Sequence, residues 1–416
     1  MGQEVLIIIP EKLYVLRDKK NQDICVDKEE YTIYYQNIIY PYSEEYDVQI
    51  ECAYGKNLGS CWRIDQFEDD VAGFPLAIRV YKTFGELVAE KQCQVKILDK
   101  EETEAIKLLC IGDSMTRSEI YIQHAVNKAR NVDTVGLRNI SYGVNHEGRG
   151  GWKSYDFLER YADTGNGVSP FLFPEECGGK EYFGDKAYWE RIESSEYYGK
   201  YSYSGIKPQY IREGMTCLDK GVLYRYQNGS FHKENENPTF AFDFQKYIER
   251  YEIEKPDIVS LLFGANEFQI CSYDELQGEL VKFIDALNRI ILSIKAYDPQ
   301  IKIIVNMPVG GGDQFAWGNA LGCVSSSKQY NYCIKMASKA ILETFENRET
   351  DGIFVCPMLA VCDTNAGFPW EFNKSNIYSD KSEIHCSNWV HPSKVGYQQM
   401  GDALAAVIVN IKKQRG

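Results

Sequence analysis

The chain has 416 residues, of which 44% are hydrophobic and 25% are charged, and its formal net charge at pH 7 is -14. This length allows about two or three domains with sizeable cores, and the composition excludes an intrinsically disordered chain. The acidic balance argues against a nucleic-acid partner, because phosphate binding requires a basic surface. No apolar run approaches the ~20 residues that span a bilayer, so we expect no membrane partner.

The first residues and the cysteines indicate in which cellular compartment the protein is expected. The start, MGQEVLIIIPEKL, has no basic stretch ahead of its apolar run, and that run is short for the core of a signal peptide. The thirteen cysteines are scattered without CxxC spacing, which is typical of reduced thiols. We therefore expect a cytoplasmic protein without a disulfide framework. The oligomeric state is not predicted by the sequence.

Residues 1–104 are expected to form a small all-β sandwich domain, of the jelly-roll or immunoglobulin-like kind. Short runs rich in β-branched and aromatic residues alternate with turn residues there. The region has no catalytic constellation, so it is either a packing module or a module that helps to hold a glycan at the neighbouring site. The predicted strands are Val5–Ile9, Tyr31–Tyr35, Val48–Cys52, Leu76–Val80 and Val95–Leu98.

From residue 105 to residue 416, strand and helix patterns alternate, which indicates a second domain of the α/β class. Such alternation implies a parallel sheet with helices on both faces. Catalytic loops then lie at the carboxyl ends of the strands. The predicted strands are Leu108–Ile111, Thr134–Ile140, Asp257–Phe263, Ile301–Asn306 and Gly352–Cys356, and the predicted helices are Met115–Arg130, Leu276–Ile294, Lys328–Glu346 and Pro392–Lys412.

Residues 160–245 interrupt this alternation with a Gly- and Tyr-rich insertion that has no clear period. A loop region of this length is either functional or disordered, and its aromatic residues argue against disorder. Tyr and Trp side chains suit stacking against sugars, but they could equally pack a small subdomain. The aromatic residues are Tyr182, Tyr188, Trp189, Tyr197, Tyr198, Tyr201, Tyr203, Tyr210, Tyr224 and Tyr226.

The stretch 106–117, IKLLCIGDSMTR, is the first candidate for chemistry. A short apolar strand ends at Gly112, and Ser114 then stands where the carboxyl edge of a sheet meets a helix N-terminus. Backbone N–H groups available at such a position favour a nucleophile whose reaction builds an oxyanion. Taken alone, the Gly-Asp-Ser tripeptide could equally be a turn with a helix cap.

Three further stretches could complete a site around Ser114. His391 precedes the last predicted helix and could act as a base, because acyl transfer requires a base whose pKa is near neutrality. Gly150 and Gly151 offer backbone N–H groups that a ligand can approach closely. Asn266 follows a buried strand and places an amide side chain at the same edge of the sheet.

In this order, the blocks resemble those of the SGNH (GDSL) hydrolase family over the whole second predicted domain. The resemblance implies a three-layer, flavodoxin-like hydrolase domain with Ser114 as nucleophile and His391 as base. The N–H groups of Ser114 and of Gly151, or of its neighbour Gly150, would form the oxyanion hole. The Asn266 side chain would be its third donor. A β-sandwich ahead of the hydrolase domain is similar to the two-domain acetyl esterases of carbohydrate esterase family two.

Two positions depart from the family pattern. Glu267 replaces the usual Asp beside Asn266, and Asn388 stands where the acid of the triad is usual. The Asn388 carbonyl oxygen could accept from the His391 ring and fix its tautomer, but it supplies no charge. The resemblance therefore implies a Ser–His dyad oriented by Asn388 or by a backbone carbonyl, or a triad completed by another carboxylate. The candidate substrate-binding residues, which flank these blocks, are Trp152, Glu267 and Trp389.

The activity that this resemblance predicts is hydrolysis of acetyl esters on a sugar or oligosaccharide. No cofactor is required, and no metal site is expected, since the spacing of His385, Cys386 and His391 fits no common zinc site. Two alternatives stay open. One is a lipid or acyl-thioester hydrolase, which would need a long apolar groove. The other is a degenerate hydrolase that only binds glycans. Ser114, Asn266 and His391 argue against this alternative, and Asn388 argues for it.

Overall fold

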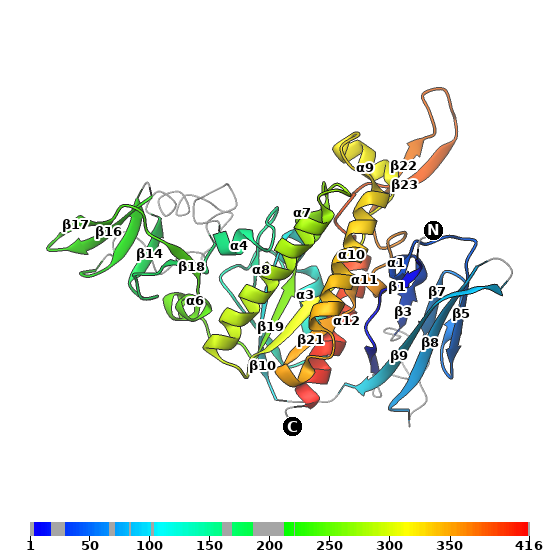
Figure 1. The fold of residues 1–416 in the computed structure, drawn as a ribbon, viewed down its shortest axis with the longest axis horizontal. Coiled ribbons are helices and arrows are strands. Elements are labelled where there is room, and N and C mark those ends of the chain that lie inside the picture. Colours follow the sequence, from blue (N-terminus) through cyan, green and yellow to red (C-terminus); the bar gives the residue numbers. More distant parts are fainter. Residues whose placement is uncertain are drawn as a thin grey trace.

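The structure is a computed structural model that describes residues 4–17, 30–65, 71–82, 85–100, 104–159, 169–185, 212–219 and 221–414. A parallel sheet with its helices occupies the middle of the molecule (Figure 1). The N-terminal sheets lie on one side of it, and a small sheet from the predicted insertion lies on the other. The fold is therefore mixed α/β, as the alternation of patterns predicts.

The central sheet confirms the predicted parallel arrangement. Its main strands have the order β11-β10-β19-β20-β21, which is 2-1-3-4-5 in chain order and is the order of flavodoxin-like sheets. Nearly all residues of β10, β19 and β21 are buried, as expected for strands covered on both faces. The strands are β10 (Ile106–Gly112), β11 (Val132–Val135), β12 (Glu147–Gly148, paired with the end of β10), β19 (Ile258–Leu262), β20 (Lys302–Asn306) and β21 (Ile353–Cys356).

The long helices pack in pairs, α8 with α10 and α3 with α12. The predicted helix 115–130 is divided into α2 and α3 at Glu119, which has a φ of +65°. The Glu119 carboxylate accepts hydrogen bonds from the N–H groups of Ile140, Ser141 and Tyr142, and these bonds hold the break. The helices are α1 (Tyr35–Ile38), α2 (Ser114–Arg117), α3 (Ile120–Ala129), α4 (Asp156–Glu159), α6 (Phe244–Tyr251), α7 (Ala265–Phe268), α8 (Leu276–Tyr297), α9 (Gln314–Leu321), α10 (Ser327–Phe345), α11 (Met358–Val361) and α12 (Lys394–Lys413).

The N-terminal region is built from β-sheets, as predicted. One sheet has the order β2-β9-β8-β5, and a second has the order β3-β7-β6. Strands β2 and β7 were not predicted, and β2 pairs in parallel with β9. The strands are β1 (Leu6–Ile7), β2 (Lys12–Arg17), β3 (Tyr31–Tyr34), β4 (Ile39–Tyr40), β5 (Asp47–Cys52), β6 (Lys56–Asn57), β7 (Cys61–Ile64), β8 (Gly73–Tyr81) and β9 (Leu87–Asp99).

The N-terminal strands share one continuous hydrophobic core with the parallel-sheet region. Polar contacts cross the same seam. Asn37 is 4% exposed, and its side chain donates to the carbonyl oxygens of Leu359 at 2.9 Å and Cys362 at 2.7 Å. The ammonium of Lys335, on α10, donates to two carbonyl oxygens at the end of α1 at 2.6 and 2.9 Å. These bonds fix the two regions on each other.

The predicted insertion is described in part. Its strands form a pair, β13-β18, and a sheet, β14-β15-β16-β17. Tyr182, Tyr224 and Tyr226 lie in these strands, and the other aromatic residues named for the insertion lie outside the described residues. The strands are β13 (Leu172–Pro174), β14 (Tyr182–Asp185), β15 (Thr216–Asp219), β16 (Val222–Gln227), β17 (Ser230–Asn235) and β18 (Phe240–Phe242).

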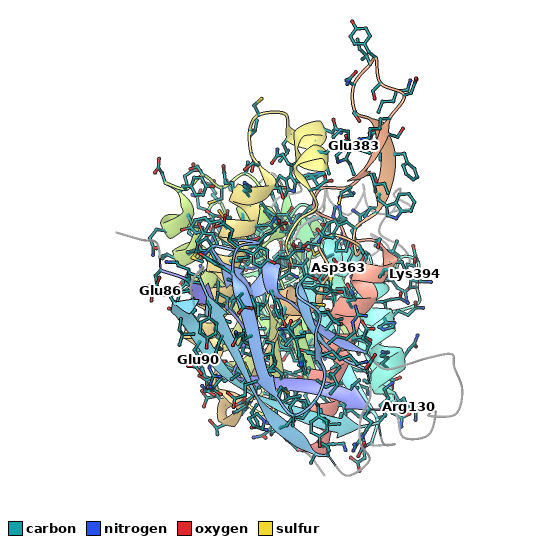
Figure 2. All side chains as sticks on the ribbon, turned by 90° about the vertical axis from the view of Figure 1, so that its right-hand side faces the viewer. Glu86, Glu90, Arg130, Asp363, Glu383 and Lys394 are labelled. Atoms are coloured by element: carbon teal, nitrogen blue, oxygen red, sulfur yellow. The ribbon has the colours of Figure 1, made fainter. Side chains whose placement is uncertain are left out.

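A hairpin of β22 (Trp370–Lys374) and β23 (Ser382–Cys386) projects from the rest of the molecule (Figure 1), and Glu383 marks it in Figure 2. Phe372 pairs with Ile384 across the two strands. Together with Trp370, these residues are 59–64% exposed. The hairpin leads directly into the loop that carries His391, so it presents aromatic side chains to solvent beside the predicted site.

The cysteines, the long helices and the potential metal ligands can be described for these residue ranges. Twelve of the thirteen cysteines fall within them, all as free thiols, ten of them buried. Within these ranges, no helix combines the length and the apolar content that crossing a bilayer requires. The ranges also hold no group of three or more side chains placed to bind a metal ion. His385 instead stacks on Phe315, with ring centroids 4.2 Å apart.

Candidate active site

Ser114 lies at the carboxyl end of β10, in a turn that requires glycine before it. A Cβ at Gly112 would lie 2.4 Å from the carbonyl oxygen of Leu262, so any larger residue would push β19 away from β10. Asp113 caps α2, because its side chain accepts from the Met115 N–H at 2.9 Å. The Ser114 hydroxyl is therefore held at the edge between β10 and β19, which is the switch point of this strand order.

The His391 ring contacts the Ser114 hydroxyl. The distance from Nε2 to Oγ is 2.7 Å, although the residues are 277 positions apart in the chain. Burial lowers the pKa of His391, and the nearby Arg117 guanidinium lowers it further. The imidazole is therefore neutral at pH 7, and its Nε2 can accept the hydroxyl proton.

Asn388 holds the loop that carries His391, and not the His391 ring. Its Oδ1 accepts from the N–H groups of Val390 at 3.1 Å and His391 at 2.9 Å. This differs from the predicted contact with the ring, because both bonds go to the backbone. Among the residues that the structure describes, the ring has one hydrogen-bond partner, the Ser114 hydroxyl. Within the described part of the chain, no carboxylate is thus hydrogen-bonded to the imidazole.

The Gly150–Gly151 turn lies against the end of β10. The Trp152 N–H donates to the carbonyl oxygen of Arg149 at 3.2 Å, and Gly151 has a φ of +76°, which closes the turn. The Arg149 N–H donates to the Gly112 carbonyl oxygen at 2.9 Å and ties the turn to the nucleophile strand. Within the described residues, the N–H groups of Gly150 and Gly151 donate to no other group; Gly151 is exposed and Gly150 is buried.

Asn266 is joined to the same turn. It follows β19, is 8% exposed, and donates through Nδ2 to the Trp152 carbonyl oxygen at 2.8 Å. An amide nitrogen has two donors, so the second N–H can face an oxyanion. The structure therefore joins Asn266 to the turn that contains Gly151, and this turn to the strand that ends before Ser114.

Glu267 and Trp152 are buried, and their burial does not fit the predicted contact with substrate. Glu267 is 2% exposed, and its carboxylate accepts from the N–H groups of Ser154 at 2.6 Å and Gly264 at 3.0 Å. Trp152 is fully buried, with its ring 5.0 Å from that of Phe157. Glu267 and Trp152 therefore stabilise the site through contacts inside the protein. The third candidate, Trp389, is half-buried and precedes His391 by two residues.

Two carboxyl groups lie behind the nucleophile. Burial raises the pKa of Asp113 and of Glu267 to about 7. The charge of Glu267 adds to the rise at Asp113. Neither is hydrogen-bonded to the His391 ring, so neither takes the place of the missing triad acid.

A buried polar network under the Gly150–Gly151 turn was not predicted. Glu147, fully buried, accepts from the Arg149 guanidinium at 2.8 Å and from the Tyr247 hydroxyl at 2.8 Å. His146 accepts from the Gly148 N–H through Nδ1 at 2.8 Å, and its Nε2 lies 3.1 Å from Glu119. The signal in the sequence was the pair of charged residues on either side of Gly148. The nearness of Arg117 to His391 had no signal in the sequence.

The pKa values of Glu119 and His146, two members of this network, are both lowered, for different reasons. Burial alone would raise the pKa of Glu119, but hydrogen bonds from His146 and from three backbone N–H groups lower it to about 2. Burial also lowers the pKa of His146, against the effect of the Glu119 charge. A charged Glu119 and a neutral His146 match the hydrogen bonds observed, because Nδ1 of His146 must stay unprotonated to accept from Gly148.

Comparisons with known proteins give weak matches. No family model matches the sequence, and a search of curated proteins finds no match. Solved structures with some similarity include a carbohydrate esterase family 3 protein from Talaromyces cellulolyticus, with 13% identity over 74% of this chain and 99% of that chain and a TM-score of 0.34. A family 3 carbohydrate esterase from Clostridium thermocellum has 14% identity over 75% and 99%, with a TM-score of 0.34.

A possible lipase from Chitinophaga pinensis has 14% identity over 74% of this chain and 98% of that chain, with a TM-score of 0.37. Structural neighbours of the chain thus include family 3 carbohydrate esterases. Because all three TM-scores are below 0.5, we draw nothing about the activity of this chain from them.

Proposed function

We propose that this chain is a serine esterase that removes acetyl groups from a sugar or oligosaccharide, with Ser114 as nucleophile and His391 as general base. The observation that carries the proposal is the 2.7 Å contact between His391 Nε2 and Ser114 Oγ at the switch point of the sheet. A nucleophile in contact with a neutral base, beside unused N–H donors, is the arrangement that acyl transfer requires.

The proposed reaction has two halves. His391 Nε2 takes the Ser114 proton as Oγ attacks the ester carbonyl, and the resulting oxyanion is held by the N–H groups of Ser114 and Gly151 and by the Asn266 amide. The tetrahedral intermediate expels the sugar oxygen, which receives the proton from His391. Water then attacks the acyl-enzyme with the same base and releases acetate. Loss of one oxyanion donor typically raises the barrier by about 3–4 kcal/mol.

No acid is part of the proposed dyad, so the orientation of the imidazole depends on its loop. Asn388 fixes this loop through the N–H groups of Val390 and His391. We assign Asn388 a positioning role on that basis. Asn388 supports the backbone from which the His391 ring projects. The ring itself stays uncharged until it accepts the Ser114 proton.

Aromatic side chains in and before the loop that carries His391 support a carbohydrate substrate. Trp389 is half-buried two residues before His391, and its ring packs edge-on against Trp317 with centroids 5.0 Å apart. The hairpin before it exposes Trp370 and Phe372. Flat apolar faces with polar edges suit the stacking of sugar rings.

The architecture proposed with this function has two parts. Residues 1–104 would be a β-sandwich made from the two N-terminal sheets, and residues 105–416 would be the hydrolase domain, with the insertion at 160–245. The helix pairs α8–α10 and α3–α12 would cover opposite faces of the parallel sheet in three layers. A cytoplasmic location stays a prediction from the sequence.

Hydrolysis of p-nitrophenyl esters tests the proposal directly. The wild type should release p-nitrophenol from the acetate ester, and Ser114→Ala should fall to background. Ser141→Ala, which removes an exposed serine hydroxyl outside the site, should keep full activity. Equal background rates for wild type and Ser114→Ala would favour a glycan-binding protein without activity. A strong preference for octanoate over acetate would favour a lipid hydrolase.

A panel of acetylated glycans then defines the substrate. Acetate release from acetylated xylo-, manno- and gluco-oligosaccharides should exceed release from p-nitrophenyl acetate in kcat/KM, because remote contacts with the sugar assist the reaction. Activity on the aryl ester without release from any glycan in the panel would contradict the carbohydrate part of the proposal.

A further inference from the structure

A cavity of about 510 Å³ opens at the seam between the N-terminal strands and the parallel-sheet region. Neither Ser114 nor His391 lines it, so it is separate from the proposed active site. Its walls come from the segment around α1 and β4, from the turn before α8, from the loop after β20 and from α10. This volume is within the range of small-molecule sites and can hold one or two sugar rings.

One wall of the cavity is a cluster of three tyrosines from separate parts of the chain. Tyr332, on α10, lies between Tyr40 and Tyr273, with ring centroids 4.7 Å and 5.5 Å away. Tyr273 is 58% exposed, so the cluster is open to solvent. Tyrosine faces are apolar and their hydroxyls are polar, which matches the alternating faces and edges of a sugar ring.

The floor of the cavity carries a buried cation. Lys335 is 8% exposed, and two of its three N–H donors are used by backbone carbonyl oxygens. Burial lowers the pKa of Lys335 to about 8, with no acidic group opposing the effect. The residues that line the cavity include no Asp or Glu. Besides the two carbonyl oxygens, the Lys335 ammonium lies 5.9 Å from the centroid of the Tyr40 ring, and it has no anionic partner among the described residues. A buried ammonium without an anion is energetically unfavourable, and a bound anion would relieve this.

A second cation stands at the rim. Lys328 lines the same cavity and precedes Lys335 on α10 by seven residues. The Lys328 side chain is exposed. In the described part of the chain, it forms no ion pair or hydrogen bond through its ammonium. The cavity thus combines two ammonium groups with aromatic walls in a protein whose net charge is -14.

We propose that this cavity binds a saccharide that carries a carboxylate, such as a uronic acid. The sugar ring would pack on Tyr332, and the carboxylate would accept hydrogen bonds from Lys335 and Lys328. The site goes beyond the esterase proposal, because it needs no contribution from the dyad. One backbone segment separates the two sites: Gly310 lines the cavity, and the Gly312 N–H donates to the Trp389 carbonyl oxygen at 3.0 Å.

Calorimetric titration with the methyl glycoside of glucuronic acid tests the site. The matched neutral probe is the methyl glycoside of glucose. Lys328→Ala and Tyr332→Leu remove a rim cation and a wall, and Lys339→Ala is the control, since Lys339 lies on the same helix and pairs with Glu343 away from the cavity. We expect saturable binding of the uronide, weakened about tenfold or more in Lys328→Ala and in Tyr332→Leu and unchanged in Lys339→Ala.

The probes contain no ester, so the result is independent of whether Ser114 hydrolyses anything. Equally tight binding of the neutral glycoside would overturn the proposal, as would the absence of saturable uronide binding. Uronide binding that is unchanged in both Lys328→Ala and Tyr332→Leu would place the ligand elsewhere and would also overturn it. Activity on p-nitrophenyl acetate should be unchanged in Lys328→Ala, which separates a failure here from a failure of the esterase proposal.

Discussion

The two sides of the proposed active site are held in different ways. The Gly150–Gly151 turn lies on a buried network in which Glu147 receives hydrogen bonds from Arg149, Tyr247 and a backbone N–H. The loop that carries His391 is held mainly through its backbone, by Asn388 and by the Gly312 N–H. The ring itself has the Ser114 hydroxyl as its one hydrogen-bond partner among the described residues.

This difference indicates that the oxyanion donors must be positioned more precisely than the base. Oxyanion donors act only if they point at one position before the reaction begins, and a buried charged network fixes such a position firmly. A base that passes one proton between two oxygens needs some freedom of rotation. We therefore expect substitutions under the turn to affect folding and activity together, and substitutions in the His391 loop to affect activity with little effect on stability.

His391→Ala should have the largest effect on activity. Removal of the base should lower kcat/KM for p-nitrophenyl acetate by about a thousandfold, within the range known for general bases. The urea midpoint should change little, because the ring is only partly buried. His232→Ala, on exposed β17, is the control and should behave as the wild type. A loss of less than tenfold in His391→Ala would contradict its role as base.

Glu147→Gln should have the largest effect on stability. Loss of the charge leaves the Arg149 guanidinium buried without its anion, which should lower the free energy of unfolding by about 3–5 kcal/mol. Activity should fall as well, since the turn is fixed by this pair. Urea titration followed by circular dichroism measures the change, with exposed Glu159→Gln as control. Unchanged stability would show that the network does not hold the turn.

Asn388→Ala should have an intermediate effect. Two backbone N–H groups lose their acceptor, so the loop that positions the imidazole is less well fixed and kcat should fall roughly tenfold. Asn388→Asp keeps an acceptor in the same place and should stay near the wild-type rate. If Asp at this position raised the rate well above the wild type, its carboxylate would reach the ring, and the distinction between loop and ring would fail.

The smallest effect should be a shift of the pH profile. Because burial and Arg117 lower the pKa of His391, kcat/KM should stay high as pH falls and decline only below the ordinary pKa of histidine. Arg117→Met removes a positive charge that disfavours the imidazolium, so the pKa should rise and the acid limb should move to higher pH. Arg289→Met, on the exposed face of α8, should leave the profile unchanged. An acid limb that does not move would exclude this coupling.

The sequence predicted the parallel sheet because its strands are continuous apolar runs. The runs in β19, β20 and β21 were placed within one or two residues of their observed ends. The prediction was less accurate for β11, the strand after α3. Residues 134–140 were predicted and Val132–Val135 are observed. The strand ends early because Gly136 has a φ of +140°. Periodicity identifies buried runs well, but it does not register a glycine turn inside an apolar stretch.

The candidate site shows the same limit. Residue type and order were sufficient to predict that Ser114 and His391 meet, and their side chains lie 2.7 Å apart. They did not reveal that the Asn388 oxygen binds the backbone or that Trp152 is in the core. Those outcomes depend on which direction a side chain takes from its loop, and this is decided by tertiary packing. The network around Glu147 was missed for the same reason, because Tyr247 and Glu119 reach it from other parts of the chain.

The seam between the N-terminal strands and the parallel-sheet region has a practical consequence for the design of fragments. Asn37 and the carbonyl oxygen of Ile39 bind polar groups of α11 and α10 across this seam. Excision of the first 104 residues would remove these partners and would expose the apolar surface that the N-terminal strands cover. We therefore expect a fragment of residues 105–416 to aggregate, and a lack of activity in such a fragment would reflect low solubility and not the loss of site residues.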